Sequence, residues 1–229
     1  MPRRLHQINT NQIYHVYNRA VLKTTLFPDT IDYSRFINLL FFYHQFSYPY
    51  SLLEQYLRKN HVVLRDEIFP SDFLSQFRID PLVRILGYCL MPNHFHLIIQ
   101  QLVDTGIRTY MHKIGSSYSQ YFNKKYDNQG AIFQGRFKLI PVDSQEQLTN
   151  LSRYIHRNPL KLPNINENHL FEYPWSSFTQ YLSNTSNPNI SPEQILHVFK
   201  SKIKYKQFVL DSTENDDNIS SELEIDGGH

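Results

Sequence analysis

The chain has 229 residues, 41% of them hydrophobic, which suffices for one well-packed domain with extensions or for two small domains. Its single cysteine, Cys89, excludes a disulfide scaffold and any zinc cluster built on cysteines, and no apolar stretch is long enough for a membrane span or a secretory signal, so we expect a cytoplasmic protein. The formal charge of +2 hides an asymmetry, because seven of the 21 acidic residues and none of the 23 lysines and arginines lie in residues 211–229.

Hydrophobic periodicity predicts seven main elements in chain order. They are a strand at 12–20, a helix capped by Asp29 or Thr30, strands at 83–91 and 94–101, a helix at 105–126, a strand at 137–143, and a helix that Ser144 caps and that ends near Pro159. This order predicts an α+β fold, specifically a ferredoxin-like sandwich in which an antiparallel sheet has helices packed on one face.

Three regions lie outside this pattern. Residues 47–82 are punctuated by prolines and predict an insertion with one or two short helices. Residues 183–210 predict a helical C-terminal extension after a main domain at 1–182, with SPEQILHVFKSKI as one short capped helix. Residues 211–229 are acidic and poor in apolar residues, so we expect them to be disordered.

His94 and His96 begin an apolar strand directly after a turn. Residues two apart on a strand point to the same face, so both imidazoles are predicted to enter one space, where they offer half of a shell for a divalent ion. A His-x-His pair is a weak signal alone, but imidazoles are poorly tolerated in such a strand without a purpose. Metal binding and plain packing stay open for the pair, and His15 and Asn18 on the first strand are more simply core residues.

Tyr154 lies in a predicted helix, and Asn158 one turn later shares its face. A phenol is a poor nucleophile at neutral pH unless something assists it, and a cation bound to a phosphate can do so. The amide oxygen of Asn158 could complete the shell of that cation. From the residues alone, the favoured alternative is that Tyr154 packs its ring and Asn158 ends the helix before Pro159.

The segment from Thr105 to Lys161 is rich in positive charge, with nine basic residues against three acidic ones and with interleaved tyrosines and phenylalanines. Such a surface suits single-stranded nucleic acid, whose phosphates pair with the charges and whose bases stack on the rings, although a solvated basic face is an equal alternative. Candidate contacts are Lys124, Lys125, Arg136, Lys138, Arg153 and Arg157.

Six motifs occur in order: YHVYNRA at 14–20, YCLMPNHFHLII at 88–99, YFNKKY at 121–126, GAIFQGRFK at 130–138, RYIHRNPLK at 153–161 and YPWSSF at 173–178. Together they resemble the single-tyrosine HUH (His-hydrophobic-His) transposases, in particular the REP-associated tyrosine transposase branch. The resemblance covers about residues 12–180. It implies that residues 1–182 form a catalytic domain, a metal-dependent nickase and strand transferase that acts on single-stranded or hairpin DNA through a covalent 5′-phosphotyrosine.

The resemblance also implies residue roles. His94 and His96 match the pair that binds Mg²⁺ or Mn²⁺, Tyr154 matches the nucleophile, and Asn158 stands where many relatives carry a glutamine as third ligand. A location at the nucleoid is implied, and a homodimer stays open, because transposon relatives are often dimers whereas the REP-associated branch is monomeric. Two other functions remain as alternatives: a catalytically decayed or regulatory hairpin-DNA-binding protein, and a metal-dependent RNA phosphodiesterase.

Overall fold

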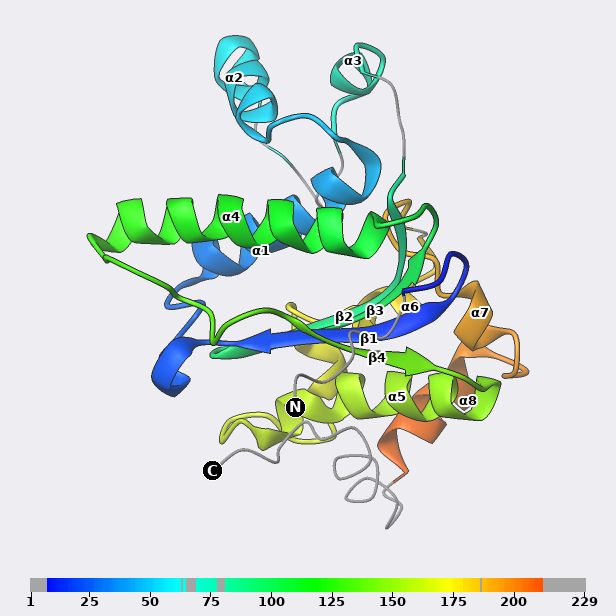
Figure 1. Ribbon diagram of the computed structural model, residues 1–229. Coiled ribbons are helices and arrows are strands. Elements are labelled where there is room, and N and C mark those ends of the chain that lie inside the picture. Colours follow the sequence, from blue (N-terminus) through cyan, green and yellow to red (C-terminus); the bar gives the residue numbers. More distant parts are fainter. Residues whose placement is uncertain (1–7, 63, 65–68, 78–80, 186, 212–229) are drawn as a thin grey trace, which may run out of the picture.

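The computed structural model describes residues 8–62, 64, 69–77, 81–185 and 187–211, so nearly all of the predicted acidic tail lies outside the described residues. A four-stranded antiparallel sheet forms the centre of the fold, in the order β2-β3-β1-β4 (Figure 1). Its strands are β1 (Ile13–Arg19), β2 (Val83–Met91), β3 (His94–Gln101) and β4 (Lys138–Val142). The predicted α+β, ferredoxin-like class is confirmed, and β1 and β3 are its central strands.

Two long helices, α1 (Thr30–Gln45) and α4 (Gly106–Tyr126), cover one face of the sheet (Figure 1). Asp29 caps α1 as predicted, since its side chain accepts from the backbone of Asp32 and the Asp32 side chain accepts in return. Phe36 of α1 packs on Phe95 of β3, with ring centroids 5.0 Å apart. We call this side of the sheet the α4 face.

A third helix, α5 (Gln145–Arg157), lies on the opposite side of the sheet, which we call the α5 face (Figure 1). The expectation that helices pack on one face therefore holds for α1 and α4 but is too narrow for the whole sheet. The physical reason is visible in β2 and β3, which are buried along almost their whole length rather than at alternate residues. A strand buried on both sides needs a cover on both sides.

Shorter elements complete the chain. They are η1 (Val21–Lys23), α2 (Ser51–Asn60), α3 (Ser71–Leu74), η2 (Asn158–Lys161), η3 (Leu170–Glu172), α6 (Phe178–Leu182), α7 (Glu193–Leu196) and α8 (Lys202–Leu210). Helices α2 and α3 fall in the predicted insertion and project beyond α1 and α4 (Figure 1). The prediction of one helix across SPEQILHVFKSKI is wrong, because Ser201 accepts from the backbone N–H of Lys204 and starts a new helix there. Within the described ranges, no helix combines the length and the apolar character needed to cross a membrane.

Candidate active site

His94 and His96 point from β3 toward the α5 face, as the alternation of the strand predicts, because Phe95 between them packs on the α4 face. Their ring centroids are 5.0 Å apart and the rings are nearly perpendicular, at 84°. The Nδ1 atom of His94 lies 2.6 Å from the side-chain oxygen of Asn93. That oxygen can only accept, so Nδ1 carries the proton and Nε2 keeps a lone pair for a ligand.

His96 is only 1% exposed, and its Nδ1 atom lies 3.0 Å from Nε2 of His15. Its other nitrogen, Nε2, is buried with no hydrogen-bond partner in the part of the chain that the structure describes. Burial, and then the neighbouring charges of His94, His15 and Lys161, lower the pKa of His96 well below its ordinary 6.5. Burial lowers the pKa of His15 to about 3. Both imidazoles are therefore neutral at physiological pH, which is the form that binds metal.

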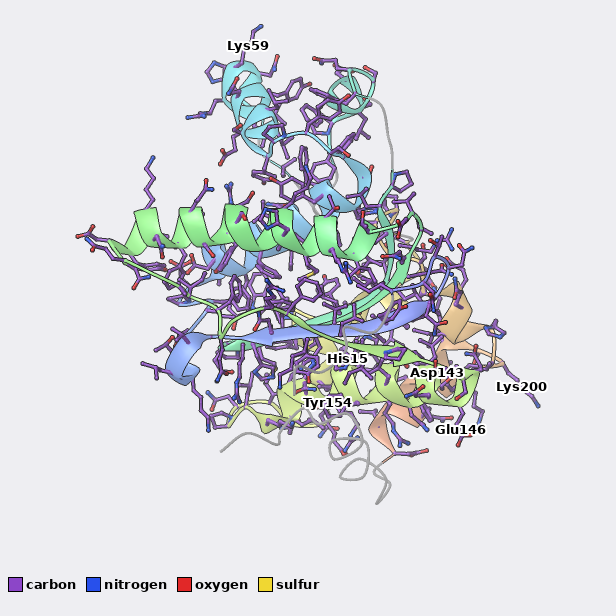
Figure 2. All side chains as sticks on the ribbon, viewed as in Figure 1. His15, Lys59, Asp143, Glu146, Tyr154 and Lys200 are labelled. Carbon is purple, nitrogen blue, oxygen red and sulfur yellow. The ribbon has the colours of Figure 1, made fainter. Side chains whose placement is uncertain are left out.

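Tyr154 faces these histidines from α5. The helix begins where predicted, since Ser144 accepts from the backbone of Gln147, although the Gln147 side chain accepts from Asp143 rather than from the cap residue. The Tyr154 ring centroid lies 5.7 Å from that of His96, at 84°, and the side chain is 4% exposed. Figure 2 shows His15 on the side of β1 that looks toward Tyr154 and α5. Tyr154 on α5 and His96 on β3 thus face one another across the α5 face.

Asn158 stands at the junction of α5 and η2. Pro159 follows in the first turn of η2, where its missing N–H costs nothing, so the chain turns without losing the position of Asn158. The Asn158 amide donates to the backbone oxygen of Tyr154 at 3.2 Å. Its side-chain oxygen is buried and, within the described residues, has no hydrogen-bond partner.

Nε2 of His96 and Oδ1 of Asn158 are thus two buried acceptor atoms on the α5 face. Buried acceptors without donors are costly, and a cation removes that cost. Two imidazole nitrogens and an amide oxygen are a donor set that a divalent first-row metal or Mg²⁺ accepts, so the residues present fit the expected metal. All three donors are neutral, and the described residues contain no group of three or more His, Cys, Asp or Glu side chains placed to bind a metal. The phosphate of a substrate would therefore have to supply the negative charge.

Three residues around this site were not assigned to it from the sequence. His15 was expected in the core; it is buried there, and it also holds His96. Asn93 orients His94. Lys161 is exposed, and its ammonium lies 5.3 Å from the centroid of the Tyr154 ring. A helical spacing of seven residues from Tyr154 was a signal that could have found Lys161, because two turns return a side chain to the same face.

The exposed candidates for DNA contact are Lys124, Arg136 and Lys138. Lys138 lies on the α5 face, with its ammonium 5.6 Å from the centroid of the Tyr17 ring, and Tyr17 pairs with both Lys138 and His96 in the sheet register. Lys138 is therefore two strands from the histidines on the same surface. Lys124 lies in the last turn of α4, away from the site.

Three other candidates hold elements of the fold together. Arg153 is 4% exposed, with its guanidinium 4.7 Å from the centroid of the Phe208 ring. Arg157 donates to the carbonyls of the last two residues of α8. Lys125 forms ion pairs with Asp29 and with the buried Asp32. DNA contact by these three side chains stays an untested prediction.

The tyrosines of α4 are poor alternatives to Tyr154. Tyr118 donates to the backbone of Leu26, and Tyr121 and Tyr126 both donate to Asp32. Burial raises the pKa of Tyr118 far above its ordinary value and the pKa of Tyr121 to about 12, and the hydrogen bond to Asp32 adds to the second shift. These phenols keep their protons, and α4 covers the opposite face of the sheet from the histidines (Figure 1).

Comparison with known proteins finds a family model that matches part of this chain. The family model described as transposase IS200 like matches residues 57–158, a segment that contains His94, His96, Tyr154 and Asn158 and that starts within the predicted insertion. No match is found among the curated proteins. A solved structure described as the "Structure of the REP associates tyrosine transposase bound to a REP hairpin" is 13% identical over 83% of this chain and 91% of that chain, with a TM-score of 0.49, a likeness that assigns no function by itself. Over residues 57–158, somewhat less than half of its length, this chain is therefore similar to the IS200-like transposases.

Proposed function

We propose that this protein is a transposase that cuts and rejoins single-stranded DNA at a hairpin, with Tyr154 as nucleophile and with His94, His96 and Asn158 as ligands of Mg²⁺ or Mn²⁺. The observation that carries the proposal is the 5.7 Å approach of the Tyr154 and His96 rings, together with the buried acceptor atoms of His96 and of Asn158, one helical turn after Tyr154. Hairpin DNA is the substrate that the sequence resemblance to REP-associated transposases implies. The proposed location is the nucleoid.

The reaction is an exchange of phosphate esters. The phenol oxygen of Tyr154 attacks the phosphorus, the bond from phosphorus to the 3′ oxygen breaks, and the phenol proton ends on that oxygen. The products are a free 3′-hydroxyl and a DNA 5′-phosphate linked to Tyr154. The 3′-hydroxyl of a second DNA end can reverse the step and release the tyrosine, so joining needs no ATP. When bound, the divalent cation polarises the scissile phosphate and offsets the charge that develops on its oxygens.

The chain itself prepares this exchange. Asn93 and His15 fix the rings of His94 and His96, so the two lone pairs are oriented before DNA arrives. Because Tyr154 is 4% exposed, a phosphate can reach its phenol only after the side chains over it move. Lys161 is exposed and lies over that ring, so its ammonium can leave the ring for an incoming phosphate and stay close to the reacting atoms.

The test uses hairpin oligonucleotides copied from the DNA that flanks the gene, incubated with the full-length protein and Mg²⁺ and run on a denaturing gel. A label at the 3′ end should move with the protein, and a label at the 5′ end should appear on a shorter free strand. An adduct that carries the 5′ label would contradict the assigned polarity. RNA copies of the hairpins serve as the comparison: cleavage of RNA without an adduct would favour a phosphodiesterase, and DNA binding without any cleavage would favour a decayed or regulatory protein.

A further inference from the structure

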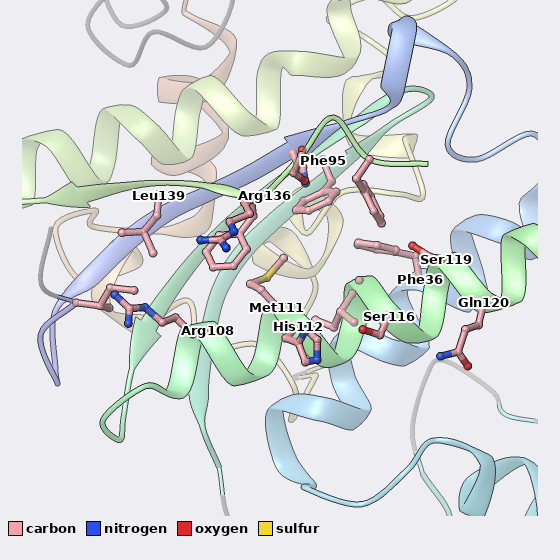
Figure 3. A pocket seen from close by; sticks show the side chains of 17 residues that line it. Phe36, Phe95, Arg108, Met111, His112, Ser116, Ser119, Gln120, Arg136 and Leu139 are labelled. Carbon is pink, nitrogen blue, oxygen red and sulfur yellow. The ribbon is translucent and has the colours of Figure 1, made fainter. Parts of the chain in front are cut away.

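A cavity of about 950 Å³ opens on the α4 face, away from Tyr154, between α4 and the edge of the sheet formed by β4 (Figure 3). Its volume is at the upper end of the range, roughly 300–1,000 Å³, that is typical of sites for small molecules and nucleotides. We call it the α4 cavity. Figure 3 shows Phe36 and Phe95 toward one end of it and Arg108 and Arg136 toward the other.

The wall formed by α4 contains a glycine that protein packing does not require. Gly115 lies in the middle of the helix, where glycine costs about 1 kcal/mol relative to alanine. A Cβ built at Gly115 would meet no atom within 4 Å, so no neighbouring side chain or backbone excludes a larger residue. The adjacent wall positions Ser116 and Ser119 are also small. The glycine at position 115 therefore leaves part of the α4 cavity open, although the fold could accommodate a larger side chain there.

The remaining lining combines aromatic rings with positive charge. Phe36 and Phe95 are fully buried, and Phe133 is half-buried with its ring 6.2 Å from that of Phe95. Arg108 and Arg136 are exposed at the cavity. Neither guanidinium forms an ion pair or a hydrogen bond within the described ranges 8–62, 64, 69–77, 81–185 and 187–211. Phe133 leaves part of its ring open to a flat base, and the two guanidiniums can fork onto phosphates, so the lining offers the two halves of a single-strand binding site.

A basic path joins the cavity to the catalytic side. Arg136 lines the cavity, and Lys138, two residues later, lies on the α5 face over Tyr17. Gly135, whose φ of +72° suits glycine, turns the chain just before Arg136, and β4 starts at Lys138. Since β4 is an edge strand, no further strand of the described chain pairs with its outer side. A DNA strand could therefore run from the cavity past Arg136 and Lys138 to Tyr154.

We infer that the α4 cavity binds unpaired nucleotides of the same DNA strand that Tyr154 cuts, with a base against Phe133 and phosphates on Arg108 and Arg136. This inference rests on the proposed function for its substrate. It adds a second contact site on the opposite face of the sheet, which would hold the single-stranded flank of the hairpin while the scissile phosphate lies at the tyrosine.

The experiment measures binding without cleavage, in EDTA, by fluorescence anisotropy of two probes. One is a labelled hairpin with eight-nucleotide flanks of mixed base composition on both ends, and the other is the same hairpin without flanks. Gly115→Leu fills the cavity, and Thr109→Leu places the same side chain on α4 away from the cavity lining. The wild type should prefer the flanked probe, and Gly115→Leu should reduce its affinity about tenfold or more while binding the bare hairpin normally.

Gly115→Leu should melt at the same or a higher temperature than the wild type, because it removes a helix-interior glycine, so unfolding cannot explain a loss of binding. The inference is overturned if the flanks add no affinity in the wild type, or if Gly115→Leu keeps that gain. It is also overturned if Thr109→Leu loses as much as Gly115→Leu. None of these results depends on cleavage. The binding measurement can therefore be interpreted even if no covalent adduct forms, and adduct formation can be interpreted even if the flanks add no affinity.

Discussion

At the scale of single residues, the proposed metal site depends on buried acceptor atoms that receive no hydrogen bond from the described residues. His96 Nε2 and Asn158 Oδ1 are buried without a donor in the described chain. That the two histidines share a face, and that Asn158 follows Tyr154 by one turn, could be predicted, because a spacing of two on a strand and of four on a helix fixes which side chains share a face. The roles of Asn93 and His15 could not, because their hydrogen bonds depend on ring tautomers and strand register.

His15 provides a test of that support. His15→Phe keeps a ring against Tyr17, whose centroid lies 4.9 Å away, but removes the nitrogen that meets Nδ1 of His96. Loss of such a supporting partner typically weakens metal binding by about 10–100-fold. We expect the Mg²⁺ concentration for half-maximal adduct formation to rise at least about tenfold, with full activity restored at saturating Mg²⁺. Mn²⁺ binding followed by electron paramagnetic resonance should weaken in parallel, and an unchanged metal requirement would show that His15 only fills space.

At the scale of elements, α5 is held from both sides. On its outer side His156 is fully buried, with Nδ1 2.7 Å from the Tyr205 hydroxyl of α8 and Nε2 2.8 Å from the Ser177 hydroxyl. The C-terminal extension thus helps to position the helix that carries Tyr154. The strands, α1 and α4 follow from periodicity and caps. The break between α7 and α8 differs from the predicted single helix, because Ser201 caps a new helix, and serine is a stronger signal for a helix start than for a helix interior.

Tyr205→Phe tests this clamp. It removes one hydroxyl that also donates to Ser152, leaving buried polar atoms of His156 and Ser152 without that partner. We expect a loss of about 1–3 kcal/mol in the free energy of unfolding by urea. The matched variant is Tyr48→Phe, because Tyr48 is 37% exposed and its hydroxyl makes no hydrogen bond within the described residues. Tyr48→Phe should cost less than about 0.5 kcal/mol, and equal losses in the two variants would argue against the clamp.

At the scale of the whole molecule, the sheet is covered on both faces and several histidines are buried in the covering layers. Burial lowers the pKa of His15 and of His156 to about 3, from an ordinary value of 6.5. The unfolded chain binds protons at these positions below pH 6.5, whereas the folded chain does not. With respect to these histidines, the free energy of unfolding is therefore at its full value at pH 7 and decreases progressively as pH falls from 6.5 toward 3. The apolar runs at 83–91 and 94–101 match the nearly continuous burial of β2 and β3, but an apolar run alone does not say which helix lies on which side.

The matching prediction uses His156→Gln, compared with wild type by urea unfolding at pH 7 and pH 5. For the wild type, each histidine with so low a folded pKa should contribute about 2 kcal/mol to the difference between the two pH values. His156→Gln should therefore lower stability at pH 7 but shrink the loss between pH 7 and pH 5 by about 2 kcal/mol. If both proteins lose the same free energy over that interval, His156 is not buried in its neutral form.

The central claim is that Tyr154 is the nucleophile of a DNA-cutting site, and one gel tests it most directly. Wild type, Tyr154→Phe and Tyr126→Phe are each incubated with Mg²⁺ and a 3′-labelled single-stranded hairpin, then run under denaturing conditions. Tyr154→Phe removes one oxygen and leaves Asn158 and its bond to the backbone in place, so hairpin binding and folding should survive while the shifted band disappears. Tyr126→Phe, on α4, should keep the band. A shifted band of normal intensity from Tyr154→Phe would contradict the assignment.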